Sequence, residues 1–213
     1  MPHGNGPFIH LDEPALRGLA PHGTVRSLPK GAVVVNEGDT TDSLYVLLSG
    51  RVKVFVSGED GKEVVVGTIA TGDYFGELVL DGSPRSASVM TLEPCRFFLI
   101  PLGDVERIIE GNPAFARDLI HKLIGMVRHL SSKVLDLAQK DVYGRFVKFV
   151  DEHAIERNGK LVVPERLTQQ DIAARIGGSR EMVNRIIKDL TAGGYITIDS
   201  KYITIHKKPP AHW

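Results

Sequence analysis

A glycine-bearing segment in the first half of the chain has the residue types that hold a phosphate. Phe75-Gly76-Glu77-Leu78 is followed by Asp81-Gly82-Ser83-Pro84-Arg85-Ser86-Ala87. Glycine and a short helical turn after it expose backbone amides to an anion, and one arginine with one hydroxyl can hold a single phosphate. The carboxylate of Glu77 can accept a hydrogen bond from a sugar hydroxyl. This order predicts a nucleotide-phosphate site, although Glu77 and Arg85 could equally form an ion pair that stabilises the loop.

Polar side chains gather on one side of a predicted helix near the end of the chain. At about 100° per residue they fall within an arc of about 140°: Arg180, Glu181, Asn184, Arg185 and Lys188. The opposite side is apolar: Met182, Val183, Ile186, Ile187 and Leu190. Arginine bonded to guanine and glutamate accepting from cytosine are pairings that the major groove favours. The pattern predicts a DNA-contacting face, and a merely solvated helix is the plainer alternative.

The segments around that helix predict how it is positioned. Thr168-Gln169-Gln170-Asp171 matches a capping signal, so a first helix begins near Gln169. It ends at Gly177-Gly178, and Ser179 caps the second helix. The alternating runs 195–198 and 202–205 then predict a β-hairpin around Asp199-Ser200-Lys201. Two helices, a glycine turn and a hairpin predict a winged helix-turn-helix.

Short apolar runs separated by glycine fill the region from about Ser27 to Ile100. Six of them are evident: 32–35, 43–48, 51–56, 63–66, 86–90 and 96–100. Short strands at spacings of about 8–12 residues favour a β-sandwich or jelly-roll barrel.

A seven-residue repeat follows Asn112-Pro113. Ile120, Val127 and Val134 recur at one position, and Leu123, Leu130 and Leu137 recur three positions later. In a coiled-coil repeat, β-branched residues at the a position and leucine at the d position, three residues later, favour a parallel two-stranded coiled coil. A helix packed on its own β-domain is the alternative. Residues 138–141 are expected to form a hinge, Asp141 to cap a further helix, and 160–164 to form a short strand.

The charge of the chain is divided between its two halves. The formal net charge is zero, from 26 basic and 26 acidic residues. Residues 1–110 hold 9 basic and 15 acidic side chains, a balance of −6, so the remainder has a balance of +6. Such asymmetry is expected when one half binds a polyanion.

A single cysteine, Cys95, allows no intrachain disulfide, and no secretory signal or membrane span is evident, so we expect a cytoplasmic protein with no membrane partner.

The cassette FGELVLDGSPRSA and the segment LTQQDIAARIGGSREMVNRIIKDL together resemble the CRP/FNR family of transcription regulators. The resemblance implies an α+β fold with an N-terminal antiparallel β-roll (jelly-roll) that binds a cyclic nucleotide (1–110), a long coiled-coil dimerisation helix (111–138) and a C-terminal winged helix-turn-helix (139–213). It also implies a homodimer that binds double-stranded DNA at an inverted repeat with TGTGA-like half-sites. Cyclic AMP is the expected effector, with no other cofactor and no metal. The sequence leaves open whether RNA polymerase is a partner.

The resemblance also implies which residues contact ligand and DNA. Gly76 and Glu77 would face the ribose and Arg85 and Ser86 the phosphate, with Leu78 and Ala87 in the same cassette. Arg180, Glu181 and Arg185 would contact guanine, cytosine and guanine. The remaining predicted DNA contacts are Thr168, Gln169, Ser179, Asn184 and Lys188.

The chain departs from the family pattern on the dimer helix. The Thr-Ser pair that contacts the purine in cyclic-AMP receptors falls on Leu130-Ser131, and only Ser131 can hydrogen-bond a base. Cyclic GMP, cyclic di-GMP, another effector or no ligand at all therefore stay open. The cluster cysteines of the FNR branch are missing, and Pro2, His3, His10 and His22 are interpreted as solvated residues rather than haem ligands.

An enzyme is the alternative from another class. Cys95 beside Arg96 could supply a thiolate, and Glu77 with Asp81 an acid/base pair, but Cys95 precedes a Phe-rich strand where a buried inert thiol is expected. We expect a regulator in which ligand bound between the β-domain and the dimer helix alters the helix seam and the hinge at 138–141.

Overall fold

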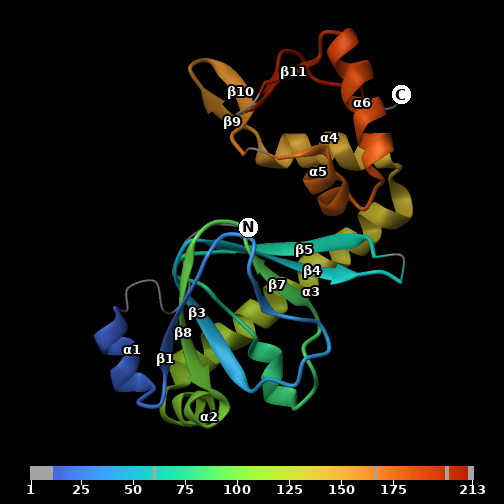
Figure 1. Cartoon of the computed structure of the whole chain (residues 1–213). Coiled ribbons are helices and arrows are strands. Elements are labelled where there is room, and N and C mark those ends of the chain that lie inside the picture. Colours follow the sequence, from blue (N-terminus) through green and yellow to red (C-terminus); the bar gives the residue numbers. More distant parts are fainter. Residues whose placement is uncertain (1–11, 60, 166, 200–201, 211–213) are drawn as a thin grey trace. The chain divides into compact units, whose positions relative to one another are not determined.

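The computed structural model describes residues 12–59, 61–165, 167–199 and 202–210 (Figure 1). The chain divides into two compact units, Met1–Gly58 with Val65–His129, and Glu59–Val64 with Leu130–Trp213. The boundaries fall just after the strand β4 (Arg51–Ser57), within the strand β5 (Glu63–Ala70), whose first two residues belong to the second unit, and within the long helix α3 (Pro113–Gln139). The division at 110 and 138 expected from the sequence stays a prediction.

The first unit contains two antiparallel sheets. One has the strand order β1-β8-β3-β6, and the other has the order β2-β7-β4-β5. The strands are β1 (Thr24–Leu28), β2 (Val33–Val35), β3 (Ser43–Ser49), β4 (Arg51–Ser57), β5 (Glu63–Ala70), β6 (Tyr74–Phe75), β7 (Ser88–Thr91) and β8 (Cys95–Pro101). Each of the six predicted runs overlaps a strand, and the antiparallel β-roll is confirmed.

The strand β3 of the first sheet is buried on both of its faces. Tyr45 and Leu47 pack in a cluster with residues of the second sheet, whereas Leu44 and Val46 pack in another cluster with residues of the helices α2 (Leu102–Gly111) and α3. Successive side chains of a strand point to opposite faces. The apolar run of β3 is therefore continuous because neither face meets water.

Four elements of this unit were not expected. They are the helix α1 (Glu13–Leu19), the strands β1 and β6, and the helix α2. β6 has only two residues, too few to show a period, and α1 buries only Leu16. The long helix after Pro113 was predicted, and its first turn is capped by the Asn112 side chain, which accepts a hydrogen bond from Phe115 N at 3.2 Å.

The second unit holds the winged helix-turn-helix, which is confirmed. Its helices are α4 (Val142–His153), α5 (Gln169–Ile176) and α6 (Arg180–Ala192), and its strands are β9 (Ile155–Arg157), β10 (Lys160–Val163), β11 (Ile196–Ile198) and β12 (Ile203–Ile205). One core cluster combines side chains of the three helices with Val163, Ile196 and Ile203 from the sheet. The predicted capping roles of Asp141 and Ser179 are both present.

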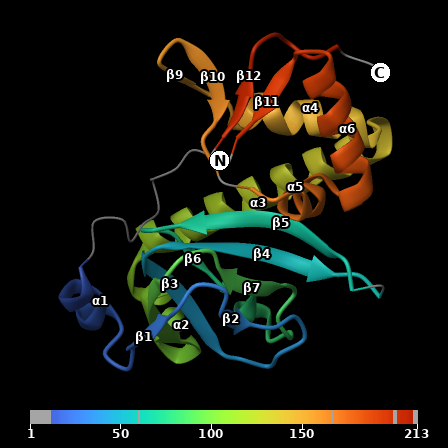
Figure 2. The ribbon, with the colours of Figure 1, turned by 45° about the horizontal axis from the view of Figure 1, so that its top comes forward.

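The wing is larger than the predicted hairpin. Its sheet has the order β11-β12-β10-β9, because β9 and β10 form a second hairpin (Figure 2). Asn158 and Gly159 join these strands with φ of 53° and 71°. An Asn-Gly pair favours such tight turns, and this signal was available in the sequence.

One expectation about a single residue was wrong. Met182 was expected in the core, but it is 46% exposed because it lies in the first turn of α6, and Val183, Ile187 and Leu190 fill the core instead. The His22 side chain is 73% exposed, in agreement with its interpretation as a solvated residue, and it also contacts Asp104. Pro2, His3 and His10 lie outside the described residues.

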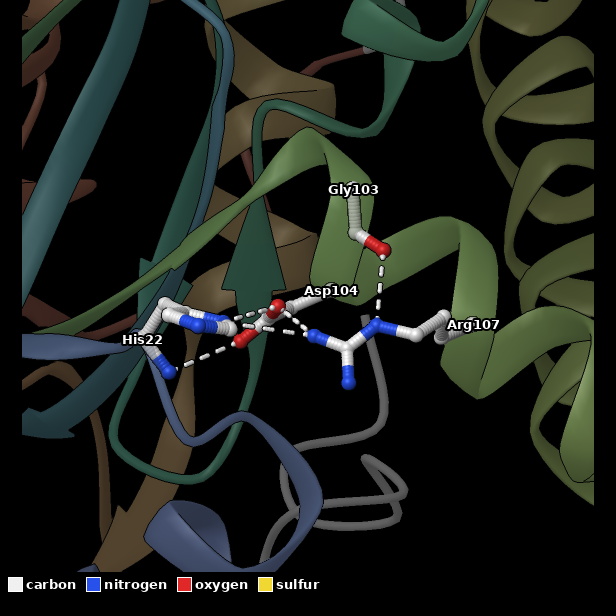
Figure 3. Close-up of polar contacts among 4 residues, drawn as sticks. All are labelled: His22, Gly103, Asp104 and Arg107. Carbon is white, nitrogen blue, oxygen red and sulfur yellow. Dashed lines mark hydrogen bonds and ion pairs between the residues drawn. The ribbon is translucent and has the colours of Figure 1, made fainter.

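The contacts of His22 attach the segment between α1 and β1 to the helix α2 (Figure 3). The Asp104 carboxylate accepts hydrogen bonds from His22 N at 3.0 Å and pairs with His22 Nδ1 at 2.9 Å, and it also accepts from Arg107. Burial raises the pKa of Asp104, but the two His22 hydrogen bonds and the Arg107 charge outweigh burial and hold this pKa below its usual value. The cluster is a structural anchor built around a buried carboxylate.

Candidate nucleotide and DNA sites

Gly76 brings the backbone of the predicted phosphate cassette close to Arg85. It precedes the short 3₁₀ helix η1 (Glu77–Asp81) and has a φ of 89°. A Cβ atom at Gly76 would lie 2.5 Å from Arg85 Nη1 and 3.0 Å from Ser43 O. Only glycine fits this backbone conformation and this space.

Arg85 is buried, and neutral oxygens hold it in place. Its Nε donates to Thr41 Oγ1 at 2.6 Å, its Nη1 to Gly76 O at 3.0 Å and its Nη2 to Ser43 O at 2.6 Å. The guanidinium carbon lies 5.6 Å from the ring centroid of Tyr45. Burial lowers the pKa of Arg85. A guanidinium has more N–H groups than these contacts use, so a fixed, partly desolvated cation remains able to bind an anion.

Glu77 is a buried carboxylate that lacks a partner for one oxygen. Its side chain is 5% exposed, and Oε2 has no hydrogen-bond partner among the described residues. Burial raises the pKa of Glu77, against the opposing effects of Lys122, its own backbone and Arg85. The alternative of a loop-stabilising ion pair with Arg85 finds no support within the described ranges, where Arg85 bonds to neutral oxygens. A hydroxyl donor from a ligand would satisfy the Glu77 carboxylate.

The other predicted ligand residues differ in their exposure and in the unit to which they belong. Leu78 and Ser86 are exposed and Ala87 is half-buried, all three beside Gly76, Glu77 or Arg85 in the chain. Leu130 and Ser131 belong to the second unit and are exposed on α3. Thr41, Ser43 and Tyr45 were missed, because their contacts with Arg85 span about forty residues of sequence and leave no local pattern.

Side-chain caps fix the start of each helix in the helix-turn-helix. Thr168 Oγ1 accepts from Asp171 N at 3.1 Å, and Asp171 Oδ2 accepts from Thr168 N at 2.8 Å. Gly177 ends α5 with a φ of 66°, and Ser179 Oγ then accepts from Met182 N at 3.2 Å. The predicted capping box and glycine turn are confirmed.

Four of the predicted DNA-contacting side chains on α6 are exposed: Arg180, Glu181, Arg185 and Lys188. Asn184 is half-buried, and its Oδ1 accepts from Gln169 Nε2 at 3.2 Å, which joins α5 to α6. Hydrogen bonds from its own backbone and from Ser179 lower the pKa of Glu181, so this carboxylate at the start of α6 stays ionised. The face thus presents three cations around one anion.

Arg145 joins the end of α3 to the turn of the helix-turn-helix. It lies on α4 and donates to Lys140 O at 2.5 Å, to Ile176 O at 2.6 Å and to Gly177 O at 3.0 Å. Arg145 therefore links Lys140, in the expected hinge at 138–141, to the last residue of α5 and to the glycine that follows it. This role was not predicted, because the acceptors are backbone carbonyls and carry no sequence signal.

Cys95 is a buried thiol. It is 2% exposed, and its Sγ contacts Glu93 O at 3.2 Å and Arg51 O at 3.3 Å. Burial raises the pKa of this thiol, which disfavours the thiolate that a nucleophile needs.

No group of three metal-ligating side chains occurs in the described part of the chain. No helix in that part is long and apolar enough to cross a membrane.

A β-roll with a phosphate-type cassette, followed by a winged helix-turn-helix, defines a class of DNA-binding regulators. The cyclic nucleotide-binding domain family matches residues 25–112, and the Crp-like helix-turn-helix domain family matches residues 134–209. A "CRP-like cAMP-activated global transcriptional regulator" of Mycobacterium tuberculosis is 30% identical over 205 residues, covering 94% of this chain and 92% of the relative. The chain belongs to the CRP/FNR family of transcription regulators, and the family prediction is confirmed.

Further relatives agree with this assignment. A "cAMP-activated global transcriptional regulator CRP" of Pasteurella multocida is 30% identical over 202 residues, covering 91% of this chain and 95% of the relative. The solved structure of the c-di-GMP-responsive regulator CLP of Xanthomonas campestris superposes with a TM-score of 0.79 at 24% identity, covering 90% of this chain and 97% of that one. A mutant of CooA from Carboxydothermus hydrogenoformans superposes with a TM-score of 0.77 at 18% identity, covering 89% of this chain and 86% of that one. The family and the relatives from Mycobacterium tuberculosis and Pasteurella multocida are transcription regulators and not enzymes. The two solved structures support the fold alone.

Proposed function

We propose that this chain is a homodimeric transcription regulator that binds cyclic AMP in its β-roll and, in response, binds an inverted DNA repeat with TGTGA-like half-sites. The observation that supports this most is the pair of buried charges in the cassette. Arg85 offers a fixed cation for the cyclic phosphate, and Glu77 offers an unpartnered oxygen for a ribose hydroxyl. A cyclic nucleotide supplies both groups on one small ring.

The exposed apolar side chains of α3 support the dimer. Five of the six residues of the seven-residue repeat are exposed: Ile120 at 55%, Val127 at 63%, Leu130 at 41%, Val134 at 66% and Leu137 at 52%. The sixth, Leu123, is half-buried against a core cluster of the first unit. A stripe of this regularity on one helix matches the seam of a two-stranded coiled coil. A second copy of α3 would bury it.

The side chains of α6 support the DNA half-site. Arg180 and Arg185 each have the planar donor pair that fits O6 and N7 of guanine, and ionised Glu181 can accept from the amino group of cytosine. A two-fold dimer would present two such faces to half-sites about one DNA turn apart. Such a protein would act in the cytoplasm.

The identity of the purine is the open part of this proposal. At Leu130 the side chain cannot hydrogen-bond a base, whereas Ser131 can. Cyclic GMP and cyclic di-GMP are therefore rival effectors that the same experiment must separate. A response to none of the three nucleotides would leave another effector or ligand-independent DNA binding.

Calorimetry with cyclic AMP, cyclic GMP and cyclic di-GMP, followed by a gel shift on a TGTGA-type palindrome, tests the function. We expect cyclic AMP to bind and to strengthen the shift. Arg85→Ala should abolish the ligand response while the dimer persists, and Arg96→Ala, at an exposed arginine of the same unit, should behave as wild type. A full ligand response in Arg85→Ala would contradict the cassette assignment.

A further inference from the structure

Lys122 attaches the helix α3 to the strand that leads into the cassette. Its Nζ donates to Asp73 Oδ1 and to Tyr74 O, each at 2.5 Å, and lies 3.9 Å from the ring centroid of Tyr74. Tyr74 begins β6, and the chain runs from β6 directly into Gly76 and Glu77. The side chain of Lys122 is only 19% exposed. One lysine of the proposed dimer helix therefore fixes the residues immediately before the proposed ribose contact.

Lys122 also lies outside the apolar stripe of α3. In the seven-residue repeat it falls two positions after Ile120, so it is not part of the seam proposed for the dimer. Its contacts are all made within the first unit, with the segment 73–74. A change at Lys122 can thus alter the cassette without removing a side chain from the seam.

The charge of Lys122 compensates the buried carboxylate of Glu77. Four ionisable groups act on or around that carboxylate: Lys122 from α3, Arg85 from the cassette loop, Asp73 before β6 and Tyr74 on β6. Lys122 lowers the pKa of Glu77 more than Arg85 does, whereas burial and Asp73 raise it. Without the lysine, burial and the Asp73 charge would favour the protonated carboxyl group.

We infer that Lys122 is a positioning residue of the ligand site, which sets its preference for ribose over 2′-deoxyribose by holding in place the strand that leads into the cassette and, with it, the Glu77 carboxylate. This inference rests on the proposed cyclic-nucleotide function and adds to it the residue that controls the sugar. An ionised carboxylate accepts a hydrogen bond from a hydroxyl more strongly than a neutral carboxyl group does. The preference for the 2′-hydroxyl should therefore depend on the charge at Lys122.

The test measures two ligands at several pH values. Calorimetry on the full chain compares cyclic AMP with 2′-deoxy cyclic AMP between pH 6 and pH 8.5, using wild type, Lys122→Gln, Lys122→Met and Lys122→Arg. Arg128→Gln is the matched control, because Arg128 is an exposed cation on the same helix. Melting temperatures with and without nucleotide show whether each variant is folded, and Lys122→Met keeps the packing of the aliphatic stem if Lys122→Gln does not fold.

We expect wild type, Lys122→Arg and Arg128→Gln to prefer cyclic AMP by about tenfold or more and to lose less of this preference on acidification than the two neutral variants do. In Lys122→Gln and Lys122→Met the preference should fall several-fold at pH 6 and recover as the pH rises and Glu77 ionises. The affinity for the deoxy ligand should show no such pH dependence.

The outcomes separate this inference from the proposed function. If wild type binds cyclic AMP and both neutral variants keep its sugar preference at every pH, the role of Lys122 is wrong and the proposed function stands. If folded wild type binds neither ligand, the proposed function is wrong and the role of Lys122 falls with it.

Discussion

Replacing Gly76 by alanine should weaken ligand binding far more than a matched replacement at Gly82. Both glycines have a left-handed backbone, with φ of 89° at Gly76 and 73° at Gly82. An alanine in that conformation costs about 1–2 kcal/mol of stability at either position. The surroundings differ, because a Cβ at Gly82 meets nothing within 4 Å, whereas at Gly76 it would lie 2.5 Å from Arg85 Nη1. The comparison therefore separates backbone strain from displacement of the guanidinium.

The magnitude follows from the contact that the displaced arginine would lose. A hydrogen bond to a charged group contributes about 1.5–3 kcal/mol, and each 1.4 kcal/mol corresponds to about a tenfold change in affinity. Gly76→Ala should thus bind cyclic AMP roughly 10- to 150-fold more weakly than Gly82→Ala. Calorimetry gives the affinities, and thermal unfolding gives the stability of each variant. Equal affinities in two folded variants would refute the placement of the phosphate at Arg85.

Three further predictions concern the dimer, the hinge and acid stability. Val127→Asp places a charge in the proposed seam and should convert the dimer to a monomer in analytical ultracentrifugation; a dimer of unchanged stability would place the interface elsewhere. In Arg145→Lys, the lysine cannot reach all three carbonyl oxygens that Arg145 contacts, so the free energy of unfolding should fall by about 1–3 kcal/mol. The effect of cyclic AMP on DNA affinity should also become smaller, whereas the affinity for cyclic AMP itself should hardly change. An unaltered effect of cyclic AMP in a gel shift would argue against coupling through this residue. Asp104→Asn should lower the free energy of unfolding at pH 7 by about 1–3 kcal/mol. The pKa of Asp104 is lowered in the folded chain. Its contribution to stability is therefore present above the ordinary pKa of about 3.9 and is lost as the pH falls through the folded pKa. In denaturant titrations, the difference in unfolding free energy between variant and wild type should shrink below about pH 4, and a difference that grows on acidification would contradict this prediction.

The elements with local signals were predictable from the sequence. The capping box at Thr168 and Asp171, the glycine turn and the two-faced pattern of α6 are all encoded within about 25 residues, and the structure places them as expected. The cassette was equally recognisable from its order of glycine, carboxylate and arginine. Such features depend on neighbours in the chain, so a single sequence contains them.

The features that escaped prediction depend on contacts between distant segments. The burial of Arg85 among Thr41 and Ser43, and the attachment of Lys122 to Asp73, join parts of the chain far apart in sequence. β6 is a strand because β3 lies beside it, not because of its two residues alone. Tertiary context, which one sequence does not display, fixed these details.

The response of DNA binding to cyclic AMP can be measured directly. Fluorescence anisotropy with a labelled TGTGA-type inverted repeat gives the DNA affinity of the purified chain with and without cyclic AMP, and a scrambled duplex of equal length serves as the control. A ligand that shifts a two-state protein must bind one state more tightly than the other. We therefore expect wild type to bind the repeat at least about tenfold more tightly with cyclic AMP than without it. Cyclic AMP should not strengthen binding to the scrambled duplex, and it should not strengthen DNA binding by Arg85→Ala. Equal affinity of wild type for the repeat with and without cyclic AMP would contradict the proposed function.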